Sequence, residues 1–312
     1  MSTIVSPAPA TAAHRREWHA GIPLDVRRTL GPLQRGAGDP TMQLRVDGSV
    51  WRTSRMPAGA VTYRVQQTGP SSASCTAWGA GAEELLDGLP DLLGARDDHA
   101  DFAPRHPLLE SAHRRHPGLR TTRTVRVLEA LVPAILEQKI LTVDAWAAWR
   151  RLLQWFGEAA PGPAADLRVV PDALGWAAIA SWDWHRAGVD PRRMRAVQVV
   201  LPHAAKLERA GRTDPAELTR LLLHLPGIGV WTAAQVAHRA VGDADALPVG
   251  DFHLPSTGHA LIGRRFTDDE VEAAFEAWRP HRYRVWRLLG ETPGSRPARR
   301  APLASRVDHR AI

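Results

Sequence analysis

Cysteine is almost missing from this sequence. Among 312 residues there is one, Cys75. A single cysteine cannot form an intrachain disulfide, a cysteine-ligated zinc site or an iron–sulfur cluster. We therefore expect Cys75 to be a small apolar residue of a strand, and we expect the chain to need no iron–sulfur cofactor.

Long apolar runs are missing as well. No stretch approaches the roughly 18 apolar residues that a membrane-spanning helix needs. Residues 1–20 lack the apolar central run of a secretory signal peptide. The sequence therefore predicts a cytoplasmic protein that does not associate with a membrane.

The charge is unbalanced towards the positive side. The formal net charge is +7, and arginine supplies almost all of the positive charge. Such a surface favours polyanions, because binding releases their condensed counterions. A coding bias towards arginine, alanine and proline would produce the same excess. Charge alone therefore makes nucleic acid a candidate partner and no more.

Changes in composition and in hydrophobic pattern along the chain predict four segments. Residues 1–38 are rich in Pro, Ala, Arg and Gly and predict a flexible arm. Residues 39–96 predict a small α+β domain, because short alternating segments within 41–76 are separated by turn residues and are followed by an amphipathic helix over 81–94. Residues 97–290 predict an all-α domain, and residues 291–312 predict a basic disordered tail.

Apolar residues three and four positions apart predict the helices of the third segment. The patterned stretches are 123–140, 142–157, 191–211, 214–225 and 269–290. Thr142 and Asp214 are candidate N-caps, with Pro215 at a first helical position. Gly157 and Gly211 suit helix ends.

One tight turn between two of these helices suggests a phosphate site. Pro226-Gly227-Ile228-Gly229 forces a reversal after Leu225, and a second helix begins at once, with Thr232 in its first turns. The glycines remove side chains that would hold a DNA backbone away, and the N–H groups that open the second helix are unpaired. The Ile228 side chain can anchor the turn by packing into the core between the two helices. An ordinary corner between two helices would have the same residues, so the turn needs a second observation.

That observation is a lone carboxylate about twenty residues further on, in Ala246-Leu-Pro-Val-Gly-Asp251-Phe252-His253-Leu254-Pro255. Here the chain resembles the helix-hairpin-helix (HhH-GPD) DNA glycosylase superfamily, in which Leu-Pro-Gly-x-Gly-x-x-Thr-Ala precedes an invariant catalytic aspartate at this distance. The residues that match the pattern are Leu225, Pro226, Gly227, Ile228, Gly229, Thr232 and Ala233. The resemblance implies that Asp251 is the catalytic residue and that these turn residues form a DNA-binding hairpin. It also implies a monovalent cation, Na⁺ or K⁺, on backbone carbonyls there, those of Leu223, Leu225 and Ile228.

The residue two positions after Gly229 separates the branches of the superfamily. Bifunctional members have a lysine there that forms a Schiff base with the sugar; this chain has Trp231. The resemblance therefore implies a monofunctional enzyme without AP-lyase activity. Trp231, the preceding α+β segment and the stretches 129–140 and 188–196 resemble the 3-methyladenine DNA glycosylase II (AlkA-type) branch.

The resemblance also assigns a base pocket and a wedge, with departures. Trp231, Gln235 and Trp286 fall at or near the pocket positions, but Gln235 stands where related enzymes present an aromatic side chain. The wedge that fills the gap left by an extruded base falls on Lys139, where well-known members have an apolar residue. Either Lys139 contacts a phosphate while Ile140 intrudes, or Lys139 is a solvated loop residue.

The function implied is hydrolysis of the N-glycosidic bond of alkylated purines, such as 3-methyladenine, in base excision repair. The expected partner is double-stranded DNA with damaged bases, bound by a monomer at the nucleoid, and the chemistry requires no cofactor. Three alternatives stay open: a glycosylase for another base, such as hypoxanthine or an oxidised purine; a non-catalytic damaged-DNA-binding protein; and a general nucleic-acid-binding protein.

Overall fold

The computed structural model describes residues 12–292, apart from the side chain of Asp268. A five-stranded antiparallel sheet of order β1-β5-β4-β3-β2 comes first in the chain. Its strands are β1 (Ala13–His19), β2 (Met42–Leu44), β3 (Val50–Met56), β4 (Gly59–Gly69) and β5 (Ser72–Trp78). The predicted small sheet is therefore present, and Cys75 is buried in β5 as expected.

The expectation of a flexible arm over residues 1–38 is wrong for the part that the structure describes. Residues Ala13–His19 form β1, which pairs with β5 from Ala13↔Trp78 to His19↔Ser72. Two short helices follow, α1 (Val26–Leu30) and η1 (Gly31–Leu33). Leu24, Val26 and Leu30 are buried in the core of the sheet layer. Residues 1–11 and most of the predicted tail, 293–312, lie outside the described residues.

Short helices cover the sheet. The predicted helix over 81–94 is two helices, α2 (Ala82–Asp87) and α3 (Leu89–Leu92), which are separated at Gly88. Helix α2 packs on β1, β4 and β5, whereas α1 packs on β3 and β4. Together they bury one apolar core against the strands.

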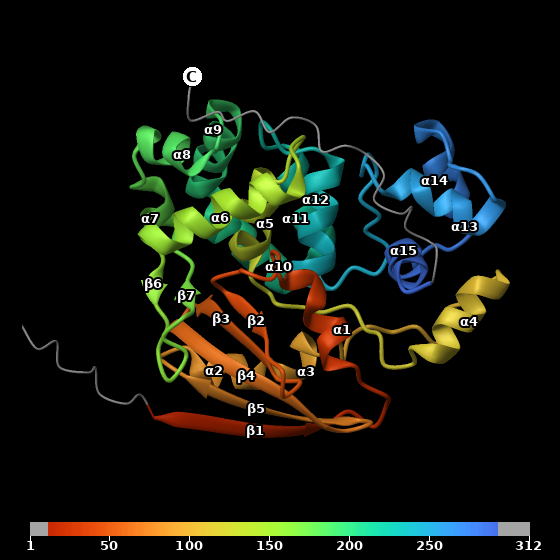
Figure 1. Ribbon diagram of the computed structural model, residues 1–312, viewed down its shortest axis with the longest axis horizontal. Helices are drawn as coiled ribbons and strands as arrows, with labels where there is room; N and C mark the ends of the chain where they lie inside the picture. Colours follow the sequence, from red (N-terminus) through yellow and green to blue (C-terminus); the bar gives the residue numbers. More distant parts are fainter. Residues whose placement is uncertain (1–11, 293–312) are drawn as a thin grey trace, which may run out of the picture.

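The rest of the chain is helical, as predicted, and Figure 1 shows it stacked on the sheet layer. The remaining helices, with two very short strands, are α4 (Pro107–Arg115), α5 (Val127–Leu136), α6 (Thr142–Phe156), β6 (Glu158–Ala159), β7 (Arg168–Val169), α7 (Ala173–Ala177), α8 (Ser181–Ala187), α9 (Pro191–Val200), η2 (Leu201–His203), α10 (Ala204–Thr213), α11 (Pro215–Leu223), α12 (Val230–Val236), η3 (Ala237–Val241), η4 (Leu254–Thr257), α13 (Gly258–Ile262), α14 (Asp268–Glu276) and α15 (Arg282–Gly290).

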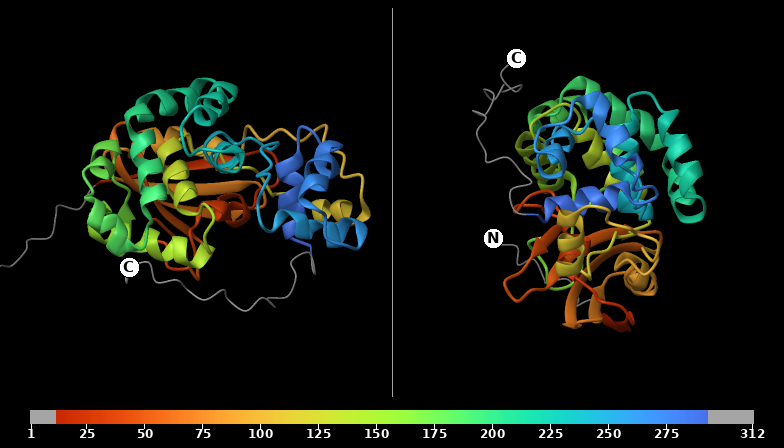
Figure 2. Two further views of the ribbon diagram at one scale, coloured as in Figure 1. Left: turned by 90° about the horizontal axis from the view of Figure 1, so that it is seen from above. Right: turned by 90° about the vertical axis from the view of Figure 1, so that its right-hand side faces the viewer.

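The helical part has two apolar cores. The larger is built from α5 to α12 and η3. The smaller joins α4 to α14 and α15, segments far apart in the sequence. Figure 2 shows the second group as a lobe beside the first. Asp251 belongs to the segment that runs from the larger core to this lobe.

A buried acidic residue ties the helices to the sheet. Glu129 in α5 accepts hydrogen bonds from Arg52 Nη2 at 2.7 Å, from Ser54 Oγ at 2.6 Å and from the Arg55 main-chain N–H at 2.6 Å. The Arg52 and Glu129 side chains are each 7% exposed. The sheet layer therefore positions α5, whose C-terminal end carries the predicted wedge.

Within residues 12–292, no helix has both the length and the apolar content that crossing a membrane would take.

Candidate functional site

The turn between α11 and α12 brings the predicted phosphate-contacting residues to the surface. Asp214 caps α11 by accepting from the Glu217 N–H, and Pro215 is its first residue, both as predicted. Gly227 has φ +85°, and a Cβ there would lie 3.1 Å from the Cβ of Ala196 in α9. Gly229 is exposed with open space around it. The main-chain N–H groups of Gly227 and Gly229 donate to no residue that the structure describes.

Ile228 anchors this turn, as the sequence predicted. Its side chain is buried in the core shared by α5 to α12. The turn is thus anchored in the core by Ile228, while Gly227 and Gly229 are exposed. Their main-chain amides can donate to an anion at the surface.

Asp251 and Trp231 meet, although twenty positions separate them. The indole Nε1 of Trp231 donates to Asp251 Oδ2 at 3.0 Å. The other oxygen, Oδ1, accepts from the main-chain N–H of His253 at 2.9 Å. Both side chains are partly exposed. A carboxylate with two fixed hydrogen bonds therefore lies beside the first turn of the helix that follows the glycine turn.

Gln235 lies one turn further along α12, on the face that carries Trp231. It is buried at 4% exposure. Its Oε1 accepts from Arg239 Nη1. The sequence named Gln235 as a pocket residue but not its partner; the signal that could have found Arg239 is its position four residues later, a spacing that brings side chains of a helical stretch together.

Trp286, the third predicted pocket residue, lies on α15. Its ring centroid is 6.0 Å from that of Tyr283, and Tyr283 stacks on His238 with centroids 3.9 Å apart. Among the described contacts, none joins Trp286 to Trp231 or Asp251. Tyr283, which the sequence did not single out, is the α15 aromatic that stacks on η3, the turn that follows the helix of Trp231.

The predicted wedge lies next to the glycine turn. Lys139 is exposed and has φ +50°, a left-handed conformation that is uncommon for a residue with a side chain. Gln138 beside it donates from Nε2 to the Gly227 carbonyl and to Thr232 Oγ1, both at 2.9 Å. Ile140 is partly buried. The structure thus brings Lys139 and the glycine turn together through Gln138, a contact that the sequence did not predict.

A buried arginine of α9 holds the end of α5, next to the predicted wedge. Arg193, 4% exposed in α9, donates from Nη1 to the Leu136 carbonyl at the end of α5, at 2.9 Å. Its Nε donates to Asp190 at 2.7 Å. A Cβ on Gly227 would crowd Ala196 of the same helix, so α9 lies against the glycine turn as well as holding the end of α5.

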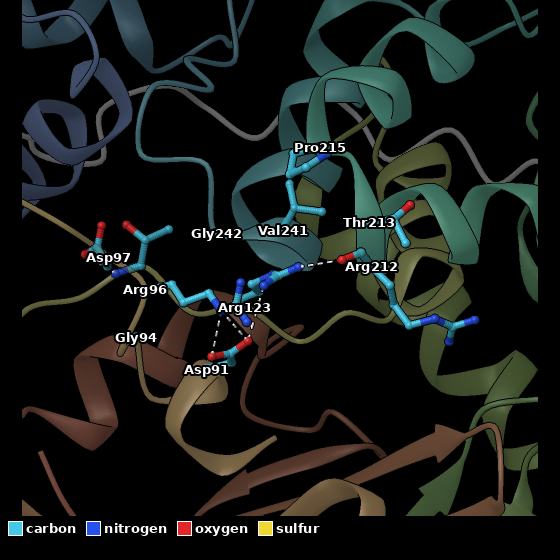
Figure 3. Close-up of a pocket in the computed structure, with 11 residues that line it drawn as sticks. Asp91, Gly94, Arg96, Asp97, Arg123, Arg212, Thr213, Pro215, Val241 and Gly242 are labelled. Carbon is cyan, nitrogen blue, oxygen red and sulfur yellow. Dashed lines mark hydrogen bonds and ion pairs between the residues drawn. The ribbon is translucent and has the colours of Figure 1, made fainter. Parts of the chain in front are cut away.

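A cavity of about 230 Å³ lies at the other end of α11. Figure 3 shows Asp91, Arg96 and Arg123 on one side of it and Thr213 and Pro215 on the other. Arg123 is tied to Asp91 Oδ2 at 3.2 Å and to the Arg212 carbonyl at 3.1 Å. None of the residues that line this cavity belongs to the predicted site. The candidate site is therefore the surface formed by the glycine turn, Asp251 and the wedge turn.

Within 12–292, no group of three or more His, Cys, Asp or Glu side chains is placed to hold a metal ion.

Comparisons with curated proteins find relatives with DNA repair names, while no family model matches the chain. It is 30% identical over 150 residues to a "probable bifunctional transcriptional activator/DNA repair enzyme AlkA" of Mycobacterium tuberculosis; the match covers 47% of this chain and 30% of that relative. The chain thus spans less than a third of that relative's length. It is 23% identical over 224 residues to a DNA-3-methyladenine glycosylase of Bacillus subtilis, covering 66% of this chain and 73% of the relative.

Solved structures share the fold. A 3-methyladenine DNA-glycosylase from Archaeoglobus fulgidus superimposes with a TM-score of 0.74 at 16% identity, over 88% of this chain and 96% of that one. An 8-oxoguanine glycosylase/lyase of Clostridium acetobutylicum superimposes with a TM-score of 0.67 at 12% identity, over 91% and 98%. The sequence relatives and the shared fold together confirm that this chain resembles the helix-hairpin-helix DNA glycosylase superfamily.

Proposed function

We propose that this protein is a monofunctional DNA glycosylase that hydrolyses the N-glycosidic bond of damaged purines in duplex DNA, with alkylated purines of the 3-methyladenine type as its substrates. The contact between Trp231 Nε1 and Asp251 Oδ2 carries the proposal, because it brings the carboxylate to the helix that the glycine turn introduces. The name of the Bacillus subtilis relative, a DNA-3-methyladenine glycosylase, supports the lesion class.

DNA would be held by its backbone. The free amides of Gly227 and Gly229 are donors for a phosphate beside the lesion, and contacts of this kind position a duplex without reading its sequence. The lesion must then leave the base stack, which costs a few kcal/mol and least for a damaged or mispaired base. Lys139, or Ile140 beside it, would fill the space that the base leaves.

The chemistry would fall to Asp251. As the glycosidic bond breaks, positive charge develops on the sugar, and a fixed carboxylate beside it stabilises that charge. The same group can orient or deprotonate the attacking water. The extruded base would stack on Trp231; a cationic alkylated purine over an indole gains about 0.5–2 kcal/mol. No amine stands at position 231 to form a Schiff base, so the DNA strand should stay intact.

A monovalent cation fits the glycine turn. The carbonyls of Leu223 and Ile228 accept no hydrogen bond from the residues that the structure describes, and the Leu225 carbonyl accepts one, from the Ile228 N–H at 3.1 Å. These oxygens would hold Na⁺ or K⁺, whose charge would help to neutralise the phosphate.

The test is base release from methylated duplex DNA by the purified protein. We expect free 3-methyladenine and 7-methylguanine to appear without strand cleavage. Asp251→Asn should still bind DNA that contains an abasic-site analogue but should release no base. Asp87→Asn, an exposed residue of the sheet layer, is the matched control and should behave as the parent. Equal release by Asp251→Asn would remove Asp251 from the mechanism, and strand cleavage by the parent would exclude a monofunctional enzyme.

Another lesion is the second candidate function. The fold is shared with an 8-oxoguanine glycosylase/lyase, so the scaffold does not by itself select alkylated bases. Duplexes that contain hypoxanthine or 8-oxoguanine belong in the same assay. Tight binding to every lesion without release would instead identify a non-catalytic damage-binding protein.

A further inference from the structure

Helix α12 and the turn after it have two unlike faces. Ala233, Val236, Ala237 and Ala240 pack into the larger helical core. Trp231, Gln235 and His238 do not belong to that core and share the other face, at positions i, i+4 and i+7. A base stacked on Trp231, as proposed above, would therefore meet Gln235 next.

The far end of this face is closed by neighbouring elements. His238 is 2% exposed and stacks on Tyr283 of α15. Arg239 donates from Nε to the carbonyl of Pro32 in η1 at 2.9 Å. Gln235 thus lies between the open end, where Trp231 contacts Asp251, and an end closed by α15 and the sheet layer.

Arg239 determines which way the Gln235 amide points. An arginine side chain has only donors, so the atom of Gln235 that faces it must be the oxygen. Arg239 Nη1 donates to Gln235 Oε1 and, at 3.0 Å, to the Gln235 main-chain carbonyl. The amide NH₂ is therefore turned away from Arg239, and it has no acceptor among the residues that the structure describes.

We propose that Gln235, oriented by Arg239, selects damaged purines that carry a carbonyl oxygen at C6 over those that carry an amino group there. The inference rests on the proposed function and ranks the substrates within it: methylated guanines are released faster than methylated adenines such as 3-methyladenine, which remain substrates. A 6-oxopurine, such as a methylated guanine or hypoxanthine, offers O6 as an acceptor for the Gln235 NH₂. A 6-aminopurine, such as a methylated adenine, would place a donor against a donor.

Burial makes this difference large enough to measure. Gln235 is 4% exposed, so water has little room to replace a missing partner. A buried donor left without an acceptor loses its solvation, and a site built to make a polar contact discriminates against an analogue that lacks it. Arg239 behind the amide reinforces the preference, because its positive charge favours the partial negative charge of a carbonyl oxygen. Its pKa is lowered to about 10, chiefly by burial and then by Arg35, a value that keeps it charged at neutral pH.

The experiment compares bases that differ at C6. Guanine derivatives also carry an amino group at C2, so the effect of C6 is read from the change that Gln235→Glu makes to the ratio. Methylated duplex DNA contains 3-methylguanine with 3-methyladenine, and 7-methylguanine with 7-methyladenine. Within each pair the methyl position and the positive charge are the same. Single-turnover rates of release are measured for all four bases by chromatography. We expect the parent to release each guanine derivative about ten- to a hundredfold faster than its adenine partner, after division by the rate of spontaneous release.

Gln235→Glu is the decisive variant. A carboxylate keeps the size of the side chain and the contact with Arg239 but presents an acceptor to the base, so the guanine-to-adenine ratio should fall at least tenfold. Gln154→Glu, the same change on an exposed face of α6, should leave it unchanged. Arg239→Lys keeps the charge without the planar fork, and it should move the ratio towards one without reversing it. Because the ratio is measured within one sample, partial unfolding of a variant does not change it.

The outcomes separate this inference from the proposed function. A ratio that Gln235→Glu leaves unchanged, or a parent that prefers adenine derivatives, would overturn the role of Gln235 while base release still stands. A parent that releases none of the four bases would overturn the proposed function and this inference with it.

Discussion

At Asp251 both carboxylate oxygens accept a hydrogen bond from the protein, one from Trp231 and one from the His253 N–H. Two such bonds fix the plane of the carboxylate. Each oxygen keeps a second lone pair, which under the proposed function would face a water or the developing positive charge of a sugar. The carboxylate is thus held in place before any substrate arrives, which is the condition for electrostatic stabilisation at little reorganisation cost.

Trp231 should therefore act through Asp251 as well as through stacking. We expect Trp231→Phe to keep an aromatic face but to lose the Nε1 donor. Hydrogen bonds to charged groups contribute about 1.5–3 kcal/mol, so the rate constant for base release should fall by about ten- to a hundredfold. Affinity for DNA with an abasic-site analogue should change little. Trp182→Phe, which alters a tryptophan 71% exposed on α8, is the control.

The measurement is single-turnover release beside equilibrium binding. A Trp231→Phe variant that loses affinity while its release rate is unchanged would show that the indole serves binding alone.

The residue types at this site were predictable, because Asp251 and Trp231 fall on motif positions. Their contact was not, since it depends on how the chain between them returns to α12.

Three elements meet at the wedge turn. The end of α5 is held by Arg193 of α9 through the Leu136 carbonyl, and Gln138 holds the glycine turn through Gly227 and Thr232. Lys139 lies at the tip in a left-handed conformation. Hydrogen bonds therefore set the distance from the predicted wedge to the amides of the glycine turn. Under the proposed function, the duplex would be opened at a fixed place relative to the bound phosphate.

Gln138→Glu tests this bracing with a side chain of the same size. A carboxylate cannot donate to the Gly227 carbonyl, so the wedge should be less well held. We expect release from duplex DNA to fall by about tenfold, which corresponds to loss of a hydrogen bond near 1.4 kcal/mol, whereas release from single-stranded methylated DNA should be unchanged. Thr232→Ser, which keeps the hydroxyl, serves as the control. An equal loss on both substrates would mean that Gln138 supports the catalytic site generally.

Element boundaries show where sequence patterns suffice and where they do not. Strands β2–β5 and the long helices follow from alternation and from three- and four-residue spacing. Strand β1 was missed because its exposed edge carries charged residues, so only pairing with β5 reveals it. Gly211 was expected to end a helix, yet it lies inside α10, where a Cβ would come within 2.6 Å of Val127 Cγ2. Thr142 is the first residue of α6 and not its cap.

At the scale of the whole molecule, a buried ion pair joins the segment that follows the sheet layer to the C-terminal lobe. Arg284 of α15 donates to Asp97 Oδ1 at 2.5 Å and to Oδ2 at 3.1 Å, and both side chains are 2% exposed. Asp97 Oδ2 also accepts from the Thr121 N–H at 2.8 Å. The lobe that follows Asp251 in the chain is therefore fastened to the segment between the sheet and α5.

Removing one member of this pair should destabilise the protein strongly. Arg284→Met leaves the Asp97 carboxylate buried without its cation, and breaking such a pair costs about 3–5 kcal/mol of unfolding free energy. Denaturant titration measures the loss. Arg264→Met, in an exposed pair with Glu270, should change stability little. If the two variants were equally stable, the Asp97–Arg284 pair would not hold the lobe in place.

Beyond α12 the chain winds through η3, Ala237–Val241, with a wider π-type turn. Such a turn holds one residue more than an α-helical turn. Removing one residue from this turn and closing it as an α-helical turn would leave the downstream chain at nearly the same angle, because the wider turn already contains the extra residue. Removing one residue from the regular part of α12 after Trp231 would instead rotate everything downstream by about 100° around the helix axis. The segment that brings Asp251 back to the Trp231 indole would then leave in another direction, and the two side chains would separate although neither was changed.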